Sequence, residues 1–383
     1  MDVQRFDLLS LLSSGRFVCR PLMKLSIASL LLRVFAVVVV SGSGAGFALG
    51  EDVRGLKWND PAPKAYDFTA RASEIDPRAQ PHPEIEFVFE KNGKPADTER
   101  GSVDTRVAPE GKLVVWLMAY NQAFFERLNS YGLHAIQVSY ANGWFSKLNK
   151  EPAPADEQYL GKIRLEATTG IDASEAVTIP QPDCMMERAY QFVKWLAKTN
   201  PEGGWEFFLT SDGKGLDWEK VIISGASHGA TSAARFAIQQ KVARCVMFCG
   251  PRDQYESWQG LPSATPANRF FGYSHVLDGG WSADHYPRSW ILLGLQKFGP
   301  IVNADEAKSP YGHSRRLITT ADVKGDAARA HGFVTPNAKN SPRDASGNYV
   351  QDDVWKYLFT SSVEEVGKAV PVEPETRLNL RGK

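Results

Sequence analysis

The segment 221–240 constrains the fold of this chain more than any other. Residues 221–224 (VIIS) form a short β-branched run, which is typical of a buried strand. Residues 225–229 (GASHG) follow at once, and the residues after them are small and alanine-rich, as in a helix that packs closely. Gly225 and Gly229 leave room for a sharp turn. The segment therefore predicts a strand that runs through a tight turn directly into a helix.

Short apolar runs alternate with helical patterns along most of the chain. Strands and helices in alternation form a mainly parallel sheet with helices on both faces. The alternating residues 85–89 predict an early antiparallel strand. Further strands are expected at 113–119, 133–140, 243–249, 269–277 and 316–320, and further helices at 122–131, 158–165, 183–198, 287–295 and 354–359. We predict one α/β domain over 85–383, with a sheet of about eight strands, preceded by an N-terminal arm over 51–84.

Charge balance and cysteine content exclude several classes of protein. The 383 residues carry 44 Lys and Arg against 44 Asp and Glu, without the basic excess of a nucleic-acid-binding protein. With 43% hydrophobic residues the chain can bury an ordinary core, and four cysteines are too few for a disulfide-dense scaffold. We expect Cys184, Cys245 and Cys249 to be buried thiols, with a bridge from Cys184 to one of the others as the alternative.

The first 50 residues have the layout of an export signal. Met23, a second candidate start, precedes Lys24 and the apolar stretch 27–40, and small residues follow up to Gly50. This order is typical of a secretory signal peptide. Arg33 interrupts the apolar stretch and leaves arms too short to span a membrane comfortably. We predict a secreted or periplasmic protein that is cleaved near Gly50, with an uncleaved membrane anchor as the alternative.

The turn at 225–229 matches the pattern G-x-S-x-G, in which the serine can act as a nucleophile. Ser227 is expected on a strained turn, with the N-terminus of the following helix aimed at a developing oxyanion. A serine hydroxyl is a poor nucleophile at neutral pH, so it needs a histidine base that a carboxylate orients. In this arrangement the acid and then the histidine follow the serine along the chain.

His331 is the predicted base. It follows the last expected strand and lies in the loop before the terminal helix, which is where the base belongs in this chain order. His285 is the main alternative. His275 within a strand and His313 before the last strand are weaker candidates.

Asp278 is the predicted acid. It stands at the end of the strand 269–277, and the carboxyl ends of strands form the active-site crevice in open α/β sheets. Asp253, which follows the preceding strand, and Asp284, further along the same loop, remain alternatives.

Two backbone N–H groups are expected to bind the oxyanion. One belongs to His228, and the other comes from the loop after 113–119, where Asn121 and Gln122 are the candidates. The sequence contains no H-E-x-x-H, C-x-x-C, G-x-G-x-x-G or phosphate-loop pattern. We therefore expect neither a metal nor a nucleotide cofactor.

Over about residues 85–360 the chain resembles the α/β-hydrolase superfamily. The resemblance rests on the GASHG turn, the strand-ending Asp278, and His331 ahead of the segment VWKYLF. A finer similarity is to a poorly characterised group of secreted bacterial serine hydrolases, whose turn usually reads G-H-S-Q-G. This similarity is carried by the segments 204–209, 217–218 and 265–275. The resemblance implies ester hydrolysis through an acyl-enzyme.

The sequence thus predicts an exported serine hydrolase that acts on a small-molecule or polymeric carboxylic ester. Amide or peptide hydrolysis by the same residues is one alternative, because the leaving group is selected by loop shape. The other is an inactive hydrolase fold that binds a ligand. We expect no nucleic-acid partner, and membrane contact only through the N-terminal segment if it is not cleaved.

Overall fold

The computed structural model describes residues 55–83, 86–139, 155–253, 256–337 and 341–372, with the backbone alone at 282–284. The predicted export signal and its cleavage site lie outside these residues. Within them, no helix is both long enough and apolar enough to cross a membrane.

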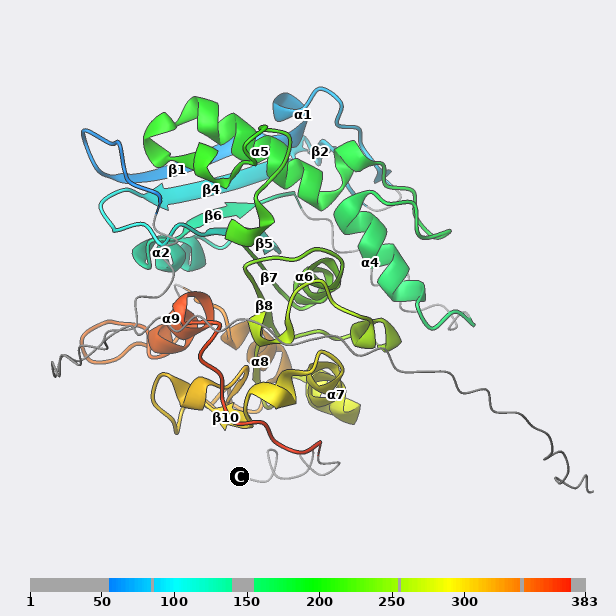
Figure 1. The fold of residues 1–383 in the computed structure, drawn as a ribbon, viewed down its shortest axis with the longest axis vertical. Coiled ribbons are helices and arrows are strands. Elements are labelled where there is room, and N and C mark those ends of the chain that lie inside the picture. Colours follow the sequence, from blue (N-terminus) through cyan, green and yellow to red (C-terminus); the bar gives the residue numbers. More distant parts are fainter. Residues whose placement is uncertain (1–54, 84–85, 140–154, 254–255, 338–340, 373–383) are drawn as a thin grey trace, which may run out of the picture. The chain divides into compact units, whose positions relative to one another are not determined.

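A nine-stranded sheet forms the centre of the described chain, in the order β1-β4-β6-β5-β7-β8-β9-β11-β10 (Figure 1). The strands from β6 to β10 in this order are parallel, and β1 and β4 are antiparallel to their neighbours. The bounds are β1 Ala65–Arg71, β4 Thr98–Asp104, β5 Leu113–Leu117, β6 His134–Gln137, β7 Val221–Ala226, β8 Arg244–Phe248, β9 Phe270–His275, β10 Ile301–Asn303 and β11 Arg316–Thr319. The predicted mainly parallel sheet is confirmed.

Two expectations for the N-terminal part were wrong. Ala65–Arg71, within the expected arm, is instead the edge strand β1, which pairs with β4 along its whole length. The described residues 86–89 of the expected strand at 85–89 do not form a strand: Phe87 makes only an isolated bridge to His82. Sequence pattern misses β1 because its residues are mostly exposed or half-buried, as in an edge strand. A separate short hairpin, β2 (Glu90–Lys91) with β3 (Lys94–Pro95), follows Phe87.

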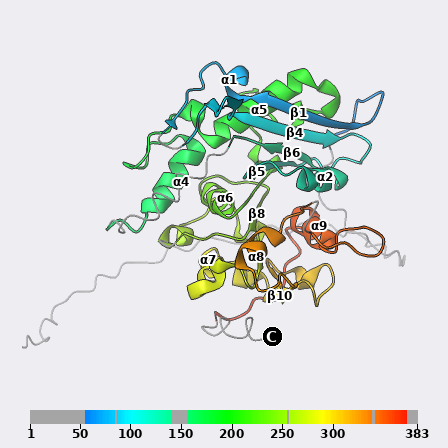
Figure 2. The ribbon, with the colours of Figure 1, turned by 180° about the vertical axis from the view of Figure 1, so that it is seen from behind.

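Helices cover both faces of the sheet (Figures 1 and 2). On one face, α4 (Tyr159–Thr169) contacts both α5 (Met185–Thr199) and α6 (His228–Gln239). On the other face lie α2 (Gln122–Ser130) and α9 (Asp352–Thr360), whose Phe124 and Phe359 rings meet Phe248 of β8. The other α-helices of the described residues are the short α1 (Ala72–Ile75), α7 (His285–Leu292) and α8 (Ala327–Phe333), and several 3-10 helices lie in the connections.

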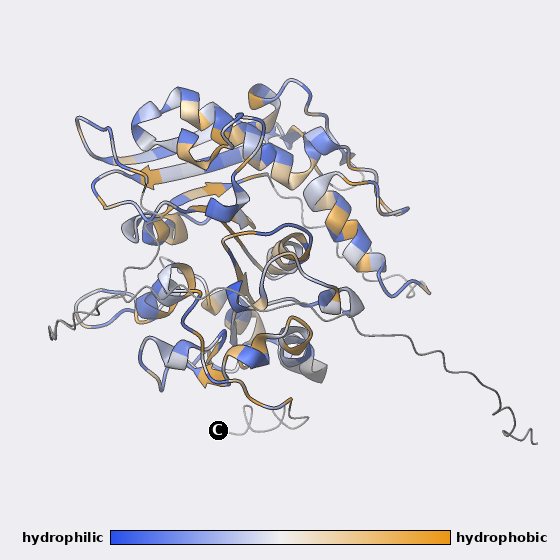
Figure 3. Ribbon diagram, viewed as in Figure 1, coloured by the Kyte–Doolittle hydropathy of each residue, from blue (hydrophilic) through white to orange (hydrophobic). Residues whose placement is uncertain are grey.

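The core lies along the central strands. Every residue of β5 and β8 is buried, because helices cover both of their faces. Figure 3 shows that α4 and α5 carry both apolar and hydrophilic residues, as is typical of helices with one face on a core. Cys184, Cys245 and Cys249 are buried and have free thiols.

Candidate active site

The turn that carries Ser227 is held in a strained conformation by close packing. Ser227 has φ 55° and ψ −118°, a region that residues with side chains rarely adopt. A Cβ on Gly225 would lie 2.3 Å from the carbonyl carbon of Gly229, and a Cβ on Gly229 would lie 1.5 Å from the Leu117 carbonyl oxygen. Glycine is therefore required at both positions. The Ser227 N–H donates to the Phe248 carbonyl at 2.9 Å, which anchors the turn to β8.

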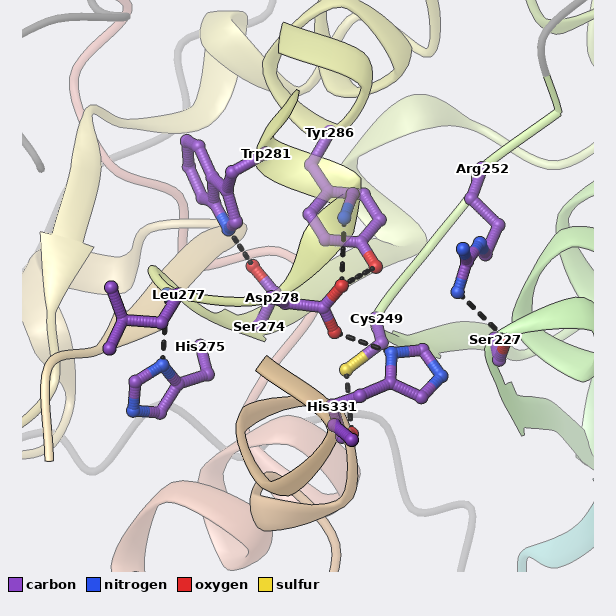
Figure 4. A network of polar contacts seen from close by, with 12 residues as sticks. Ser227, Cys249, Arg252, Ser274, His275, Leu277, Asp278, Trp281, Tyr286 and His331 are labelled. Atoms are coloured by element: carbon purple, nitrogen blue, oxygen red, sulfur yellow. Dashed lines mark hydrogen bonds and ion pairs between the residues drawn. The ribbon is translucent and has the colours of Figure 1, made fainter. Parts of the chain in front are cut away.

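Asp278 and His331 form a direct pair at the same edge of the sheet (Figure 4). His331 Nδ1 lies 2.5 Å from Asp278 Oδ2, and Asp278 Oδ1 accepts from the Gly280 N–H at 2.8 Å and from the Tyr286 hydroxyl at 2.9 Å. Burial is the largest influence on the Asp278 carboxyl and raises its pKa, but the hydrogen bond and charge of His331, together with the Gly280 N–H, outweigh burial and hold the pKa below its usual value. An ionised carboxylate only accepts hydrogen bonds, so Nδ1 carries the proton.

His331 lies in a helix rather than in the expected loop. Asp326 caps α8 by accepting from the N–H groups of Ala328 and Arg329, which lets the alanine-rich residues after it form a helix. The ring of His331 stands between Asp278 and Ser227, with Nε2 directed to the Ser227 side (Figure 4). Within the described residues no hydrogen bond joins Ser227 to His331.

The alternative acids are not placed beside His331. Asp253 is buried and accepts from Arg164 Nε at 2.6 Å, from Arg164 Nη2 at 2.5 Å and from Trp258 Nε1 at 3.1 Å. This ion pair occupies both carboxylate oxygens. The side chain of Asp284 lies outside the described part of the chain.

The alternative bases have other partners. His285 Nδ1 lies 3.8 Å from Glu256, and His313 Nδ1 lies 3.5 Å from Glu365. His275 Nε2 lies 2.7 Å from the Ala321 carbonyl. Among the predicted acids and bases whose side chains are described, the structure thus brings together Asp278 and His331.

The predicted oxyanion donors flank the turn. His228 is the first residue of α6, so its backbone N–H belongs to the positive end of that helix. Burial, with Arg164 nearby, lowers the pKa of the His228 imidazole to about 4, which keeps this side chain neutral at neutral pH. Asn121 caps α2: its Oδ1 accepts from the Phe124 N–H at 3.1 Å, and its Nδ2 donates to the Pro336 carbonyl at 2.7 Å.

Gln122 is the first residue of α2, and its side chain donates to Glu126 at 2.9 Å. The side chains of Asn121 and Gln122 are therefore both occupied, which leaves their backbone N–H groups for an oxyanion. Because β5 lies next to β7, with Leu117 opposite Gly225, the loop that carries these two residues starts beside the turn.

Two site residues were missed by sequence reasoning. The Cys249 thiol donates to the His331 carbonyl at 3.2 Å, and Arg252 Nη1 donates to Ser227 Oγ at 3.3 Å. Both follow β8, so the rule that selected Asp278 from the carboxyl end of its strand would also have selected them. One ligand atom each of Cys249, Asp278 and His331 lie within 4.8 Å of one another, which is compact enough for a metal ion. The hydrogen bond between Asp278 and His331 and the interaction of the Cys249 thiol with Asp278 account for this proximity.

Three features together decide the architecture: the strand order, the strained turn between β7 and α6, and the acid and histidine that follow β9 and β11. The chain has the α/β-hydrolase fold. This confirms the predicted fold class, with nine strands in the main sheet of the described residues instead of about eight.

No protein-family model matches the chain, and no curated protein matches its sequence. Among solved structures, it is similar to an S-formylglutathione hydrolase from Agrobacterium tumefaciens, with 12% identity over 82% of this chain and 99% of that one and a TM-score of 0.37. Two structures of esterase B from Lactobacillus rhamnosis also match. The inhibited form has 11% identity over 70% of this chain and 78% of that one, with a TM-score of 0.30. The second has 13% identity and a TM-score of 0.22, and the match spans 47% of this chain and only 41% of the esterase.

Proposed function

We propose that this protein is a serine hydrolase that cleaves carboxylic esters through an acyl-enzyme. Ser227 is the nucleophile, His331 the general base and Asp278 the residue that orients it. The observation that carries the proposal is the 2.5 Å pair of His331 Nδ1 and Asp278 Oδ2, with Ser227 on a strained turn at the same sheet edge. A strained serine, then a buried carboxylate and then a histidine base along the chain are the parts that acyl transfer needs in this fold.

In the first half of the reaction, Ser227 Oγ forms a bond to the ester carbonyl carbon and its proton passes to His331 Nε2. The carbonyl oxygen becomes an oxyanion, which the N–H of His228 and one N–H from Asn121 or Gln122 stabilise. The bond to the leaving alcohol then breaks, and His331 returns the proton to that alcohol. Asp278 stabilises the imidazolium while it exists.

In the second half, water attacks the acyl-enzyme carbonyl while His331 removes a proton from it. The carbon–Oγ bond breaks, the carboxylic acid leaves, and Oγ regains its proton from His331. The balanced reaction is ester plus water giving acid plus alcohol, and it requires no cofactor.

Export is part of the proposal and is supported by the charged, apolar and small-residue order of residues 1–50. Expression of the full chain in a bacterium, followed by fractionation and N-terminal sequencing, tests it. A mature protein outside the cytoplasm that starts near Glu51 is expected. An intact N-terminus in the cytoplasm would refute export.

A fluorophosphonate probe tests the nucleophile, because it reacts with an activated serine. Labelling of the wild type is expected, with loss of labelling in Ser227→Ala and strong slowing in His331→Ala. Ser130→Ala removes an exposed serine of α2 and serves as the matched control, with labelling unchanged. Equal labelling of Ser227→Ala and wild type would overturn the assignment. A panel of nitrophenyl esters and the corresponding anilides then separates ester from amide hydrolysis.

A further inference from the structure

A second charged group touches the nucleophile. Arg252 Nη1 donates to Ser227 Oγ at 3.3 Å, and Figure 4 shows the guanidinium directed at Ser227. The residue is partly exposed, so a ligand that approaches Ser227 from solvent can also reach Arg252.

The loop that carries Arg252 is tied down at three points. The Arg252 N–H donates to Thr231 Oγ1 at 3.2 Å, and the Gly250 carbonyl accepts from Trp290 Nε1 at 3.1 Å. The next residue, Asp253, is locked into its buried pair with Arg164. The guanidinium therefore projects from a backbone fixed to α6 and α7, which lowers the cost of ordering it around a ligand.

Arg252 forms no ion pair in the described part of the chain, and the carboxylates of three acidic residues near the site have other partners. Asp253 is paired with Arg164, Asp278 with His331, and Glu256 with Arg288 at 2.6 Å. Among the residues that the structure describes, Arg252 thus has no carboxylate partner beside Ser227. Such a group is suited to bind an anion that arrives with the substrate, because a guanidinium matches a carboxylate in shape and charge.

We propose that Arg252 is an anion-binding subsite and that the preferred substrate is an ester carrying a carboxylate near its scissile carbonyl. This inference rests on the proposed esterase function and narrows its substrate class. The carboxylate belongs to the acyl part, as in a half-ester of a dicarboxylic acid, or to the alcohol part, as in an acylated hydroxy acid. On binding, the guanidinium moves its hydrogen bond from Ser227 Oγ to the carboxylate, which frees the nucleophile.

Matched ester pairs measure the preference. Monomethyl succinate and methyl butyrate differ by a carboxylate in place of a methyl group on the acyl side, and butyryloxyacetate and ethyl butyrate differ in the same way on the alcohol side. The quantity to compare is the ratio of kcat/KM for the anionic ester to kcat/KM for the neutral ester. In one or both pairs, Arg252→Gln is expected to lower this ratio about tenfold or more, since the hydrogen bonds to a charged group are lost.

Arg252→Lys is expected to restore part of the ratio, because it restores the charge without the planar fork. Arg106→Gln is the control for net charge: Arg106 is exposed, is paired with Asp104 and precedes β5 at the end of the strand away from the site. In Arg106→Gln, the ratio of kcat/KM for the anionic ester to kcat/KM for the neutral ester should equal that of the wild type. If Arg252→Gln leaves the ratio unchanged in both pairs, including the case in which kcat/KM falls equally on neutral and anionic esters, the subsite is refuted.

A binding measurement separates this inference from the proposed function. Succinate is expected to bind the Ser227→Ala variant in calorimetry and not the Ser227→Ala/Arg252→Gln variant. Equal binding or no binding by both variants refutes the subsite even if the wild type hydrolyses esters. A wild type that neither reacts with fluorophosphonate nor cleaves any ester refutes the function, whatever succinate does.

Discussion

His331 Nδ1 and Asp278 Oδ2 lie 2.5 Å apart, although 53 residues separate them in the sequence. The contact joins the end of β9 to α8 and sets which imidazole nitrogen carries the proton. With Nδ1 protonated, the lone pair of Nε2 is presented on the Ser227 side, where a general base is needed. Gly280 and Tyr286 hold the other carboxylate oxygen, so the acid cannot rotate away from the histidine.

Asp278→Asn is expected to reduce kcat for ester hydrolysis by about 10³–10⁴-fold, because the amide allows the wrong imidazole tautomer. The steady-state rate on a nitrophenyl ester measures this. Asp253→Asn is the comparison, since Asp253 was the alternative acid. It should lower the melting temperature through the Arg164 pair while the folded fraction keeps most of its activity. A larger loss of kcat in Asp253→Asn than in Asp278→Asn would reverse the assignment.

Gly229→Ala is expected to destabilise the protein by more than about 3 kcal/mol, because the added Cβ would lie 1.5 Å from the Leu117 carbonyl oxygen and the strained turn cannot move aside. Urea unfolding followed by tryptophan fluorescence gives the free energy of unfolding. Gly215→Ala is the matched control, because its Cβ would meet nothing closer than a Thr210 methyl at 3.9 Å. Equal stability of the two variants would contradict the packing described for the turn.

The central strands were predictable because a short run that is apolar on both faces is typical of a strand buried within a sheet, as at β5 and β8. The edge strand β10 has three residues, all half-buried, and leaves no comparable pattern. β4 was missed for a different reason: its buried positions include Glu99 and Ser102, which read as a surface loop. The hydrophobic pattern of a sequence cannot show that a strand buries polar residues, because the partners of these residues come from distant segments.

The candidate site was predictable where topology limits the choice. Few aspartates and histidines follow strands β8, β9 and β11, so Asp278 and His331 could be selected by position. Position after β8 also singles out Arg252, but its contact with Ser227 could not be predicted, because an arginine in a loop is usually solvated. Its place depends on the hydrogen bonds that fix the backbone after β8, and these come from Thr231 and Trp290.

Glu99 is expected to make stability fall as pH rises. Burial raises the pKa of its carboxyl to about 8, against an ordinary 4.5, although Arg188 opposes the shift. The folded state therefore binds more protons than the unfolded state between these values. Its contribution to stability is fully present below about pH 4.5 and is lost as pH rises through 8. The free energy of unfolding of Glu99→Gln should match the wild type near pH 5 and exceed it by roughly 2–4 kcal/mol at pH 9. If the difference in free energy of unfolding between Glu99→Gln and the wild type stays constant across pH, Glu99 is ionised in the folded state throughout.

The buried ion pair of Arg164 and Asp253 stabilises the turn that carries Ser227. Both side chains are at most 1% exposed, and Arg164 Nη1 also donates to the His228 carbonyl at 3.1 Å and to Ser232 Oγ at 3.0 Å. Removing one partner leaves an uncompensated buried charge, so Arg164→Met or Asp253→Leu alone should cost about 3–5 kcal/mol in the free energy of unfolding. The double variant leaves no charge behind and should cost clearly less than the sum of the single changes.

Because Arg164 holds the His228 carbonyl, Arg164→Met should also slow fluorophosphonate labelling of Ser227 in protein that is still folded, whereas Asp253→Leu should slow it less. Additive losses in the double-mutant cycle would mean that the two charges do not stabilise each other.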